Sequence, residues 1–369
     1  MCRTLALVFP NQLPKVVRYF SHRVDLAGEE RPMKAPAGFV ALSLLLLSGT
    51  PTEPLCAQTV TAGELTLRLA GMTAVTGYEQ AMVDTLLTLL PGAVRDRAGN
   101  AVLVLGNGPP RRLAACPLDE TGFAVGRVRP DGWLTLRRSP ARTHLPGPLF
   151  DQQLEGQRVT VFAARGPVPG VVAVRSVHLT RGRGSLSQEP FTVDDAYVDV
   201  GAASASGAAD LGVGVLNPVA LAKRPHRYGS DKLAAPWVGR RAACAALLAA
   251  ARRSVAEPGK DSRSGSTVVA FVVEQQLSAR GLLTLATSRG PFAESWIADD
   301  SVGARAVQAA DSNPELGAVG SPPRAALGQI HAWQISTAYP GTAVETVSLE
   351  QVEHTSAAIA GWLQGEAGQ

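Results

Sequence analysis

Histidine is scarce in this sequence, and the histidines that it has are scattered. Only six of the 369 residues are His, and none belongs to an H-x-x-x-H or H-x-D pair, the spacings that bring metal ligands together on one helix or strand. No Ser-His-Asp arrangement can be assembled from motifs. Gly106 and Gly108 precede two prolines, so no helix start is available there for a phosphate. These absences argue against a zinc site whose ligands come from one short motif, against a serine hydrolase and against a phosphate-binding loop.

Long apolar runs are also lacking, since none reaches the ~20 residues that a membrane-spanning helix needs. Met33-Lys34 opens a short basic segment, residues 38–47 are apolar, and Leu55-Cys56-Ala57 ends in a small residue. This pattern is typical of a secretory signal. We therefore expect a signal peptide at 33–57, a mis-annotated upstream extension at 1–32, and a secreted or periplasmic protein. We expect no stable membrane span after signal cleavage; an uncleaved signal that anchors the protein is the alternative.

Charge of one sign does not dominate the chain. The formal net charge is +4, and arginine pairs such as Arg111-Arg112 and Arg240-Arg241 are scattered without interleaved aromatic residues. Such a pattern is typical of a solvated surface, so we expect no nucleic-acid partner. The hydrophobic fraction of 46% is sufficient for a sizeable core.

Cysteine is rare, with four residues in the chain. Cys2 and Cys56 precede the expected mature protein, which leaves Cys116 and Cys244. A disulfide between these two is possible in an exporting compartment. Cys244 lies in an alanine-rich stretch that is typical of a buried helix, so we expect two buried free thiols.

Two stretches alternate strands and helices in the manner of an α/β domain. In the first, helix-spaced apolar residues over 79–90 precede predicted strands at 101–105 and 112–115. The second begins after about Tyr228. It is predicted to contain helices at 237–254 and 348–364, strands at 267–273, 295–298 and 330–335, and a loop over 301–323. Ser348 and Gln351 fit a capping box at the start of the last helix.

The segment between these stretches has a different character. Short β-like runs are separated by glycine and proline, which predicts a small all-β module inserted between two α/β halves. The runs lie at 123–128, 133–137, 158–163, 170–174 and 196–200.

Several short motifs follow one another in a characteristic order. They are GMTAVTGYE at 71–79, DRAGN at 96–100, LDETGF at 118–123, GQRV at 156–159, YVDVGA at 197–202 and VETVS at 344–348. In order and spacing these motifs resemble the tetrahedral, or glutamyl-type, aminopeptidases, a cellulase M-like family of two-metal exopeptidases. The similarity covers about residues 64–363.

The resemblance implies an α/β fold with a mixed central sheet flanked by helices, as in zinc peptidases, and an inserted small β-barrel or PDZ-like domain. The α/β domain would comprise 58–122 and 228–369, and the inserted domain, of the dimerisation type, would comprise 123–227. The family assembles through this β domain. We therefore expect a homo-oligomer, or a hetero-oligomer with an active paralogue.

In that family two zinc- or cobalt-like ions activate a water and polarise the scissile carbonyl, and a glutamate takes the proton of the water. At nearly every matching position this chain has a residue that cannot perform the role. Pro117 stands at a His ligand, Gly239 at the bridging Asp, Gln275 and Gln276 at the general base and a ligand, and Gly341 at a second His. Proline and glycine have no side-chain donor atom, and an amide neither takes a proton at neutral pH nor binds zinc well.

Two acidic positions of the family pattern are kept. Asp299 matches a metal ligand, and Asp119 matches the carboxylate that orients a ligand from behind. One carboxylate does not hold zinc in water, so we expect both positions to be without metal and we expect no cofactor. Zinc or cobalt would be the cofactor if a centre had been rebuilt. Glu120, Asp300 and Glu274 are further acidic residues available for such a centre.

The sequence therefore favours an exported family member that has lost its two-metal centre and acts in binding or assembly. An active metal-dependent aminopeptidase with a rebuilt site is the alternative, and the sequence leaves open whether the protein is an enzyme. A peptide is one candidate ligand, because Arg240, Arg241 and Arg280 could receive a carboxylate. In the other interpretation these arginines pair with the aspartates of the region and fill the space that the metals would take.

Overall fold

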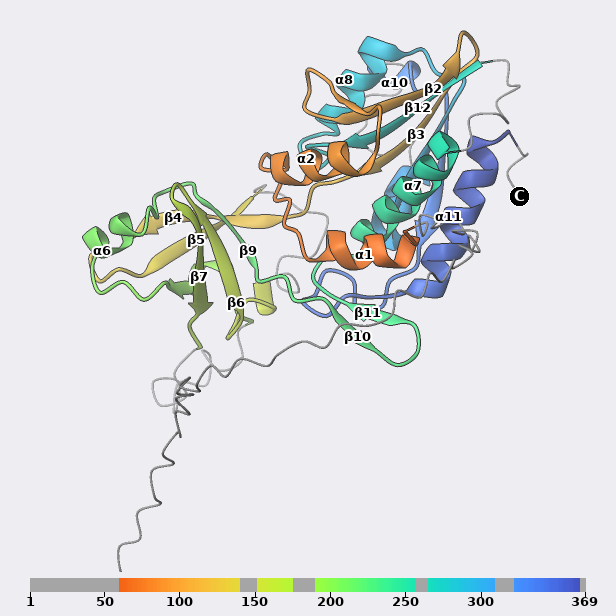
Figure 1. The fold of residues 1–369 in the computed structure, drawn as a ribbon. Helices are drawn as coiled ribbons and strands as arrows, with labels where there is room; N and C mark the ends of the chain where they lie inside the picture. The colour runs from red at the N-terminus through yellow and green to blue at the C-terminus, as the bar shows by residue number, and fades with distance from the viewer. Residues whose placement is uncertain (1–59, 140–150, 175–189, 257–264, 309–321, 366–369) are drawn as a thin grey trace, which may run out of the picture. The chain divides into compact units, whose positions relative to one another are not determined.

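The computed structural model describes residues 60–139, 151–174, 190–256, 265–308 and 322–365. The expected upstream extension at 1–32 and the expected signal peptide at 33–57 lie outside these described residues. The described chain forms an α/β part and a closed β-barrel (Figure 1). The fold class predicted from the sequence is confirmed.

A six-stranded mixed sheet forms the centre of the α/β part. Its order is β1 (Val94–Arg95), β2 (Ala101–Asn107), β12 (Gly265–Val272), β3 (Arg111–Pro117), β13 (Glu294–Asp300) and β14 (Gln329–Ile335). β12, β3, β13 and β14 run parallel, whereas β1 and β2 pair antiparallel. Successive residues of β3 face opposite sides, and both sides are buried: Ala114 and Cys116 join one core, and Leu113 and Ala115 join another.

Helices cover both faces of this sheet (Figure 1). One face packs against α1 (Ala62–Ala70), α2 (Gln80–Leu89), α7 (Val238–Ala256) and α11 (Leu349–Leu363). The other face packs against α8 (Arg280–Arg289), which contacts the short α10 (Pro322–Ala325). α7 is buried on nearly all sides, because α1, α11 and the sheet surround it. Its alanines allow these neighbours to approach closely, and a helix that is apolar all round is typical of a buried position.

The capping box predicted at the last helix is only half formed. The hydroxyl of Ser348 accepts a hydrogen bond from the main-chain N of Gln351 at 3.3 Å, as expected. The side chain of Gln351, however, donates to the hydroxyl of Ser336 at 3.2 Å instead of returning to the cap. A complete capping box, not predicted, begins α1, where Thr61 and Glu64 bond each other's main-chain N–H groups.

The prediction of a loop over 301–323 is wrong at its start, where the chain forms α9 (Ser301–Gln308). Asp300 begins this helix: its Oδ1 accepts from the main-chain N of Val302 at 2.9 Å and of Gly303 at 2.8 Å. A carboxylate that satisfies the free N–H groups of the first turn stabilises a helix whose composition alone does not favour it. Residues 309–321 lie outside the described residues.

The β module is a closed barrel of six strands. Their order is β4 (Gly122–Val128), β5 (Leu134–Ser139), β8 (Tyr197–Asp199), β7 (Gly166–Val172), β6 (Arg158–Ala163) and β9 (Pro218–Leu221). Alternate residues point inward, and Phe123, Val125, Val159, Val161 and Val198 form much of its core. The run predicted at 170–174 begins earlier than expected, because β7 pairs with β6 along its whole length.

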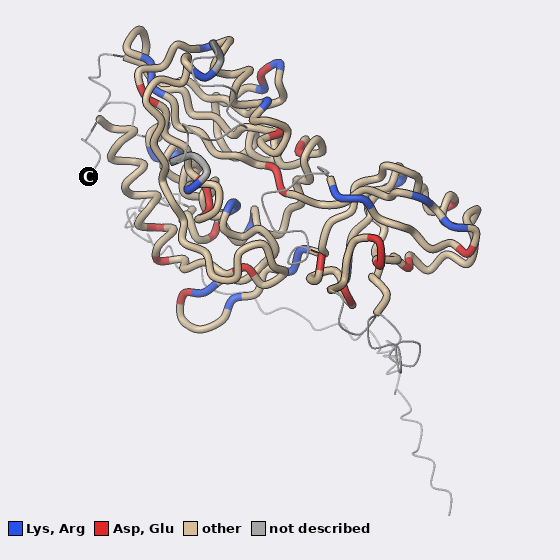
Figure 2. The backbone as a smooth tube through the Cα atoms, turned by 180° about the vertical axis from the view of Figure 1, so that it is seen from behind, with Lys and Arg blue, Asp and Glu red and all other residues tan. Residues whose placement is uncertain are grey.

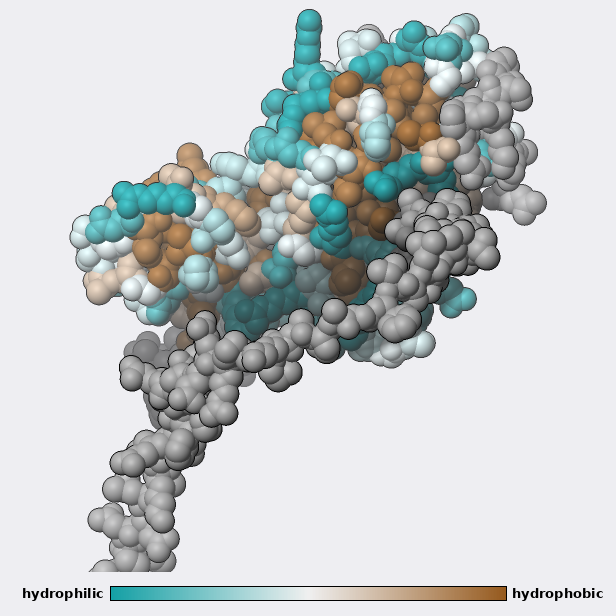
Figure 3. Space-filling view, in the orientation of Figure 1, coloured by the Kyte–Doolittle hydropathy of each residue, from teal (hydrophilic) through white to brown (hydrophobic). Residues whose placement is uncertain are grey.

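The remaining elements are short. η1 (Val193–Asp195) and α6 (Ala205–Asp210) lie in the connections of the barrel, and β10 (His226–Tyr228), β11 (Lys232–Ala234) and β15 (Thr346–Ser348) form a small antiparallel sheet. In Figure 2 the acidic and basic residues are scattered along the described chain among positions that are neither. Figure 3 shows apolar and polar side chains interspersed on the face in view. Among the residues with a described structure, no helix has the length and apolar character needed to cross a bilayer.

Candidate functional site

The carboxyl ends of β3, β12 and β13 meet at one edge of the central sheet, because these strands are parallel and adjacent through β3. Ligand sites of α/β sheets typically form at this edge. α7 also begins here, so Arg240 and Arg241 in its first turn reach the same place. The polar residues that the strands deliver to this edge are Asp119, Glu120, Gln275, Gln276, Asp299 and Asp300.

The side chain of Arg240 lies between two aspartates of this edge. Its Nε donates to Oδ1 of Asp299 at 3.0 Å, and its Nη2 donates to Oδ2 of the same carboxylate at 3.3 Å. Its Nη1 donates to the main-chain oxygen of Asp119 at 2.8 Å and lies 3.7 Å from Oδ1 of that residue. All three residues are buried. A two-pronged contact between guanidinium and carboxylate is among the strongest ion pairs, so Arg240 neutralises charge that would otherwise be buried without a partner.

A second buried ion-pair group lies beside the first. Oε2 of Glu120 accepts from Nη2 of Arg241 and from Nζ of Lys223, the latter at 2.7 Å. Arg241 also donates to the main-chain oxygen of Leu118, and Lys223 donates to that of Pro236 at 2.9 Å. Several hydrogen bonds thus replace the water that these charges lose on burial, which is the condition for a buried ion pair to be tolerated.

Glu345 is held by main-chain donors. Its Oε1 accepts from the N–H of Gly239 at 2.7 Å, and its Oε2 accepts from the N–H of Gly341 at 2.9 Å. No side chain fits at Gly239, because a Cβ atom there would lie 2.2 Å from Cγ2 of Thr337 and 2.9 Å from Cβ of Asp300. The packing of this edge therefore requires glycine at position 239.

Asp119 lies at the inner end of the network and is fully buried. Its Oδ2 accepts from the hydroxyl of Thr76 and from the main-chain N of Gln276, both at 2.9 Å. Its Oδ1 has no hydrogen-bond partner among the described residues and lies 3.7 Å from Nη1 of Arg240. The role predicted for Asp119, that of orienting a ligand at position 117, has no counterpart here, since its carboxylate instead ties a loop and an arginine together.

Glu79 is a further buried acid near this edge and is 2% exposed. Its Oε1 accepts from the main-chain N of Gly77 and of Glu274, both at 3.0 Å. Burial, followed by the nearby charge of Asp119, raises the pKa of Glu79 to about 7 in spite of these two donors. Glu79 therefore changes charge close to neutral pH.

The other buried groups of the site have shifted pKa values as well. Burial raises the pKa of Asp119, and it raises the pKa of Asp299 to about 7 against the attraction of Arg240. Burial, with the charge of Asp300, raises the pKa of Glu345 to about 7. The pKa of Lys223 is lowered to about 8, because burial outweighs its ion pair. These shifts share one cause, the removal of charged groups from water.

The positions that differ from the family pattern are spread over this edge. Pro117 is the last residue of β3. Gln275 is buried and its Oε1 has no hydrogen-bond partner, whereas Gln276 contributes only its main-chain N–H to Asp119. Gly341 has a φ of +72°, a conformation that favours glycine, and uses its N–H to hold Glu345.

The pairing expected for the three arginines is only partly observed. Arg240 pairs with aspartates, but Arg241 pairs with Glu120. Arg280 does not join the buried group: its Nε lies 2.7 Å from Oε2 of Glu274, and its side chain is 63% exposed. The difference arises because Arg280 begins α8, on the opposite face of the sheet from α7.

Cys116 and Cys244 form a disulfide with a Cα–Cα distance of 5.4 Å, so the expectation of two buried free thiols is wrong. Cys116 belongs to β3 and Cys244 to α7, and both are fully buried. The side chain of Cys116 turns to the face of the sheet that α7 covers. The bond fixes α7 against the strand that leads into the site.

Two members of the site were missed in the sequence analysis. Lys223 follows β9 in a stretch that matches no motif, and no local pattern predicts that its ammonium reaches Glu120. Glu79 ends the motif at 71–79, so its position just before α2 was the available signal. In both cases the partner lies far away in the chain.

Chemically, this edge is a set of buried carboxylates, and two guanidinium groups and one ammonium group offset part of their charge. Within the described ranges, no three His, Cys, Asp or Glu side chains come together in a way that could hold a metal ion. Thr76 is a hydroxyl in contact with a carboxylate, but it is buried and Asp119 is committed to other donors. The ion pairs of this edge tie the strand ends, the loop that follows them and α7 together.

Two curated relatives are similar to one half of the chain. SgcX of Escherichia coli (strain K12), which carries a provisional aminopeptidase name, is 30% identical over 187 residues, or 48% of this chain and 47% of that protein. The lysyl aminopeptidase of Pyrococcus furiosus is 26% identical over 195 residues, or 52% of this chain and 54% of that protein. The chain thus spans about half the length of the curated relatives that it matches.

Solved structures share the fold over a longer range. The TET1 peptidase of Pyrococcus horikoshii matches with a TM-score of 0.66 and 19% identity over 82% of this chain and 99% of that one. A TET aminopeptidase of a marine-sediment Thaumarchaeota archaeon matches with a TM-score of 0.66 and 19% identity over 82% and 96%. At this level of identity the matches establish the fold.

These comparisons correct the expectation that the protein needs no cofactor. Members of the family that the relatives represent, the TET aminopeptidases among them, are metal-dependent. A divalent metal is therefore the cofactor that the lineage implies.

One family model covers more than half of the chain. It is the model of the M42 glutamyl aminopeptidase, and it matches residues 99–291. The matched range begins at the turn before β2, includes the whole barrel and α7, and ends after α8. The resemblance drawn from the motifs is confirmed, and the chain belongs to the M42 glutamyl aminopeptidase family.

Proposed function

We propose that this protein is a family member that has lost the two-metal centre and acts through binding or assembly instead of peptide hydrolysis. The position of Arg240 is the observation that carries the proposal. Its guanidinium bonds the carboxylate of Asp299, which is the one metal-ligand position kept from the family pattern. A guanidinium is always charged and cannot ligate a metal, so it competes directly with a cation for the same oxygens.

The residues of this edge do not fit the divalent metal that the family implies. Pro117 and Gly239 offer no donor atom, and the space beside Gly239 is already filled. Two of the described histidines stack on aromatic rings, His331 on Trp296 at 4.7 Å and His226 on Tyr228 at 6.0 Å. We therefore assign no metal-dependent step to these residues.

The charge balance of the site supports the same proposal. A metal pair would neutralise the carboxylates of the family site, whereas here protein cations contact them. Several of the buried carboxylates lie within 4 Å of a protein cation, a distance at which attraction in the interior is strong. The pairs are Asp119 and Asp299 with Arg240, and Glu120 with Arg241 and Lys223.

We also propose that the protein is exported to a secreted or periplasmic location. The signal pattern at 33–57 motivates this, and the disulfide between Cys116 and Cys244 supports it. Disulfides persist in oxidising compartments and are rare in the cytosol. Mass spectrometry of the mature N-terminus from the producing cell tests the proposal, which fails if the protein begins upstream of residue 58 and fractionates with the cytosol.

A homo-oligomer is the assembly that we propose, with a hetero-oligomer containing an active paralogue as the second candidate. The TET1 peptidase of Pyrococcus horikoshii, whose fold this chain shares, can assemble into a tetrahedron or a large octahedral shell. Native mass spectrometry of the protein purified alone, and after co-expression with a paralogue, separates the two candidates. A monomer in both preparations contradicts them.

An assay of metal content and activity tests the central proposal. We expect the protein purified without chelator to contain far fewer than two zinc or cobalt ions per chain and to release no chromophore from aminoacyl-p-nitroanilides. Cobalt and zinc are added separately before the assay, so that an empty but competent site is also detected. Hydrolysis that EDTA abolishes and metal restores would overturn the proposal and establish a rebuilt metal-dependent aminopeptidase.

A further inference from the structure

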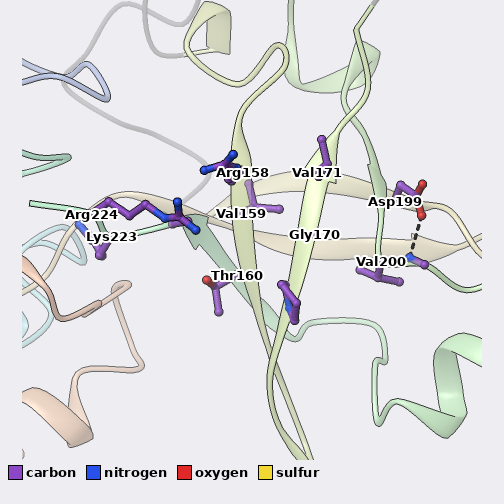
Figure 4. Close-up of a pocket in the computed structure, with 12 residues that line it drawn as sticks. Arg158, Val159, Thr160, Gly170, Val171, Asp199, Val200, Lys223 and Arg224 are labelled. Carbon is purple, nitrogen blue, oxygen red and sulfur yellow. Dashed lines mark hydrogen bonds between the residues drawn. The ribbon is translucent and has the colours of Figure 1, made fainter. Parts of the chain in front are cut away.

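A hollow of about 670 Å³ lies on the outer wall of the barrel, and Lys223 of the buried network is one of the residues that line it. Its residues come from β6, β7, β8 and the segment after β9 (Figure 4). The volume is within the range of small-ligand sites, roughly 300–1,000 Å³.

The strand pairing places charges at the two ends of this hollow. Val171 of β7 pairs with Arg158 of β6 on one side and with Asp199 of β8 on the other. All three side chains point outward, because their neighbours Val159, Gly170, Val172 and Val198 are buried inside the barrel. Directly paired residues lie about 5 Å apart, so the Cβ atoms of Arg158 and Asp199 are separated by roughly 10 Å. No ion pair joins the two among the described residues, and Figure 4 shows their side chains at opposite ends of the hollow.

A second arginine joins the positive end. The main-chain N of Ala222 donates to the oxygen of Arg158 at 2.9 Å, so Arg224, two residues further on, is its diagonal neighbour on the same face. Figure 4 shows both guanidinium groups at the same end of the hollow. Neither guanidinium has an ion-pair or hydrogen-bond partner among the described residues. Two adjacent cations without a counter-charge attract an anion, and guanidinium groups match the planar shape of a carboxylate.

The opposite end and the floor have a different chemistry. Oδ1 of Asp199 accepts from the main-chain N of Gly201 at 2.7 Å, which orients the carboxylate and leaves Oδ2 free of partners within the described chain (Figure 4). Between the ends lie Val171, which is 51% exposed, and Pro169 and Thr160. An apolar strip with one hydroxyl thus connects a site for an anion to a site for a cation.

We propose that this hollow binds a short peptide with free ends, its α-carboxylate at Arg158 and Arg224 and its α-ammonium at Asp199. An extended chain advances by roughly 3.3–3.6 Å per residue, so two or three residues match the separation of the charges. A small apolar side chain fits against Val171. The site goes beyond the proposed function, because it lies on the barrel and would exist whether or not the buried edge hydrolyses peptides.

Isothermal titration with the tripeptide Ala-Leu-Ala tests this proposal on the full chain. Its C-terminal amide and its N-acetylated form are titrated in parallel. We expect the free tripeptide to bind, and the Arg158→Gln/Arg224→Gln variant and the amide each to lose about tenfold in affinity, since each removes charge-assisted hydrogen bonds. Asp199→Asn and N-acetylation should weaken binding through the other end. Arg127→Gln, an exposed barrel arginine outside the hollow, is the matched control and should leave affinity unchanged.

Three results would overturn the proposal: equal affinity for the amide and the free peptide, unchanged binding in the double arginine variant, or no binding at millimolar peptide. A change of native mass in the Arg158→Gln/Arg224→Gln variant would also overturn it, because a second copy of the chain would then be the occupant. Mass spectrometry of the titrated peptide detects any cleavage separately. Cleavage would refute the proposed loss of hydrolysis while leaving the dependence on Arg158 and Arg224 intact.

Discussion

The two charged regions of this protein use their arginines in opposite ways. At the edge of the central sheet, Arg240 and Arg241 are buried and bonded to carboxylates and main-chain oxygens of the same chain. On the barrel, Arg158 and Arg224 line an open hollow and have no partner in the described chain. The family motifs lie at the edge of the central sheet. The arginines that are available to bind a ligand, however, lie on the barrel.

Under the proposed loss of the catalytic centre, the difference indicates where function can remain. Buried charges without metal must be neutralised from within the protein, and this neutralisation consumes their capacity to bind anything else. Exposed charges have no such requirement, because water already solvates them. The comparison therefore predicts large stability effects and no binding effects at the edge, and the reverse at the barrel.

The largest effect is expected from removing the disulfide that holds the buried region. The Cys116→Ala/Cys244→Ala variant should lose about 5 kcal/mol in free energy of unfolding, the chain-entropy value for a loop of this length, because the cysteines are 128 residues apart. Urea unfolding of the oxidised protein and the variant measures the loss. Identical curves, with and without dithiothreitol, would mean that the bond does not contribute to the stability of this region.

Removing the central cation of the edge should cost nearly as much. Arg240→Met leaves Asp119 and Asp299 buried without a cation beside them, and we expect a loss of about 3–5 kcal/mol in unfolding free energy at pH 7. Arg280→Met is the matched control, since Arg280 is also paired but its side chain is 63% exposed, and its loss should stay below about 1 kcal/mol. Similar losses of stability in both variants would contradict the distinction between buried, paired charges and exposed charges.

The buried acid Glu79 should make stability depend on pH. Its pKa is raised from 4.5 to about 7 in the folded protein, so the folded state binds the proton more tightly and stability falls as the pH rises from about 4.5 to 7. At pH values above this range, the ionised carboxylate of Glu79 lowers the free energy of unfolding by about 3 kcal/mol. Glu79→Gln should remove that part of the pH dependence in unfolding experiments between pH 4.5 and 8. Glu350→Gln, at an exposed position of α11, should leave the profile unchanged.

The smallest effect on stability is expected at the barrel. Arg158→Gln and Arg224→Gln should each change the free energy of unfolding by less than about 0.5 kcal/mol, because neither side chain holds another part of the described chain. Thermal unfolding of these variants beside Arg127→Gln measures this. A loss above about 1 kcal/mol would assign the two arginines a structural role and remove the contrast between the regions.

Much of the fold could be predicted from local patterns. The apolar spacing over 79–90 and the alanine-rich stretch over 237–254 predicted α2 and α7 to within about two residues, because amphipathic and buried helices differ in the periodicity of their apolar residues. The β module was predicted from short runs separated by glycine and proline, whereas its form as a barrel was implied by the resemblance to the family. The start of α9 was not, because it depends on one carboxylate, that of Asp300, and not on the composition of the helix.

The site itself could be predicted only where a motif fixed the position. The aspartates and arginines of the edge were found from their alignment with the family pattern. The contacts of Arg241 and Lys223 with Glu120 could not be found in this way, because each joins residues about 100 or more positions apart in the sequence. The disulfide was left open for the same reason, since pairing is a matter of distance in the fold and neither cysteine lies near the other in the sequence.

The crowding around Gly239 has an evolutionary consequence. Thr337, Asp300 and Glu345 occupy the volume next to its Cα, so a single substitution of Gly239 by aspartate would damage the fold before it could supply any ligand. Under the proposed function, a lineage that has filled this space cannot retrace the step one substitution at a time. Selection would therefore find new uses for the scaffold on surfaces that are still free to change.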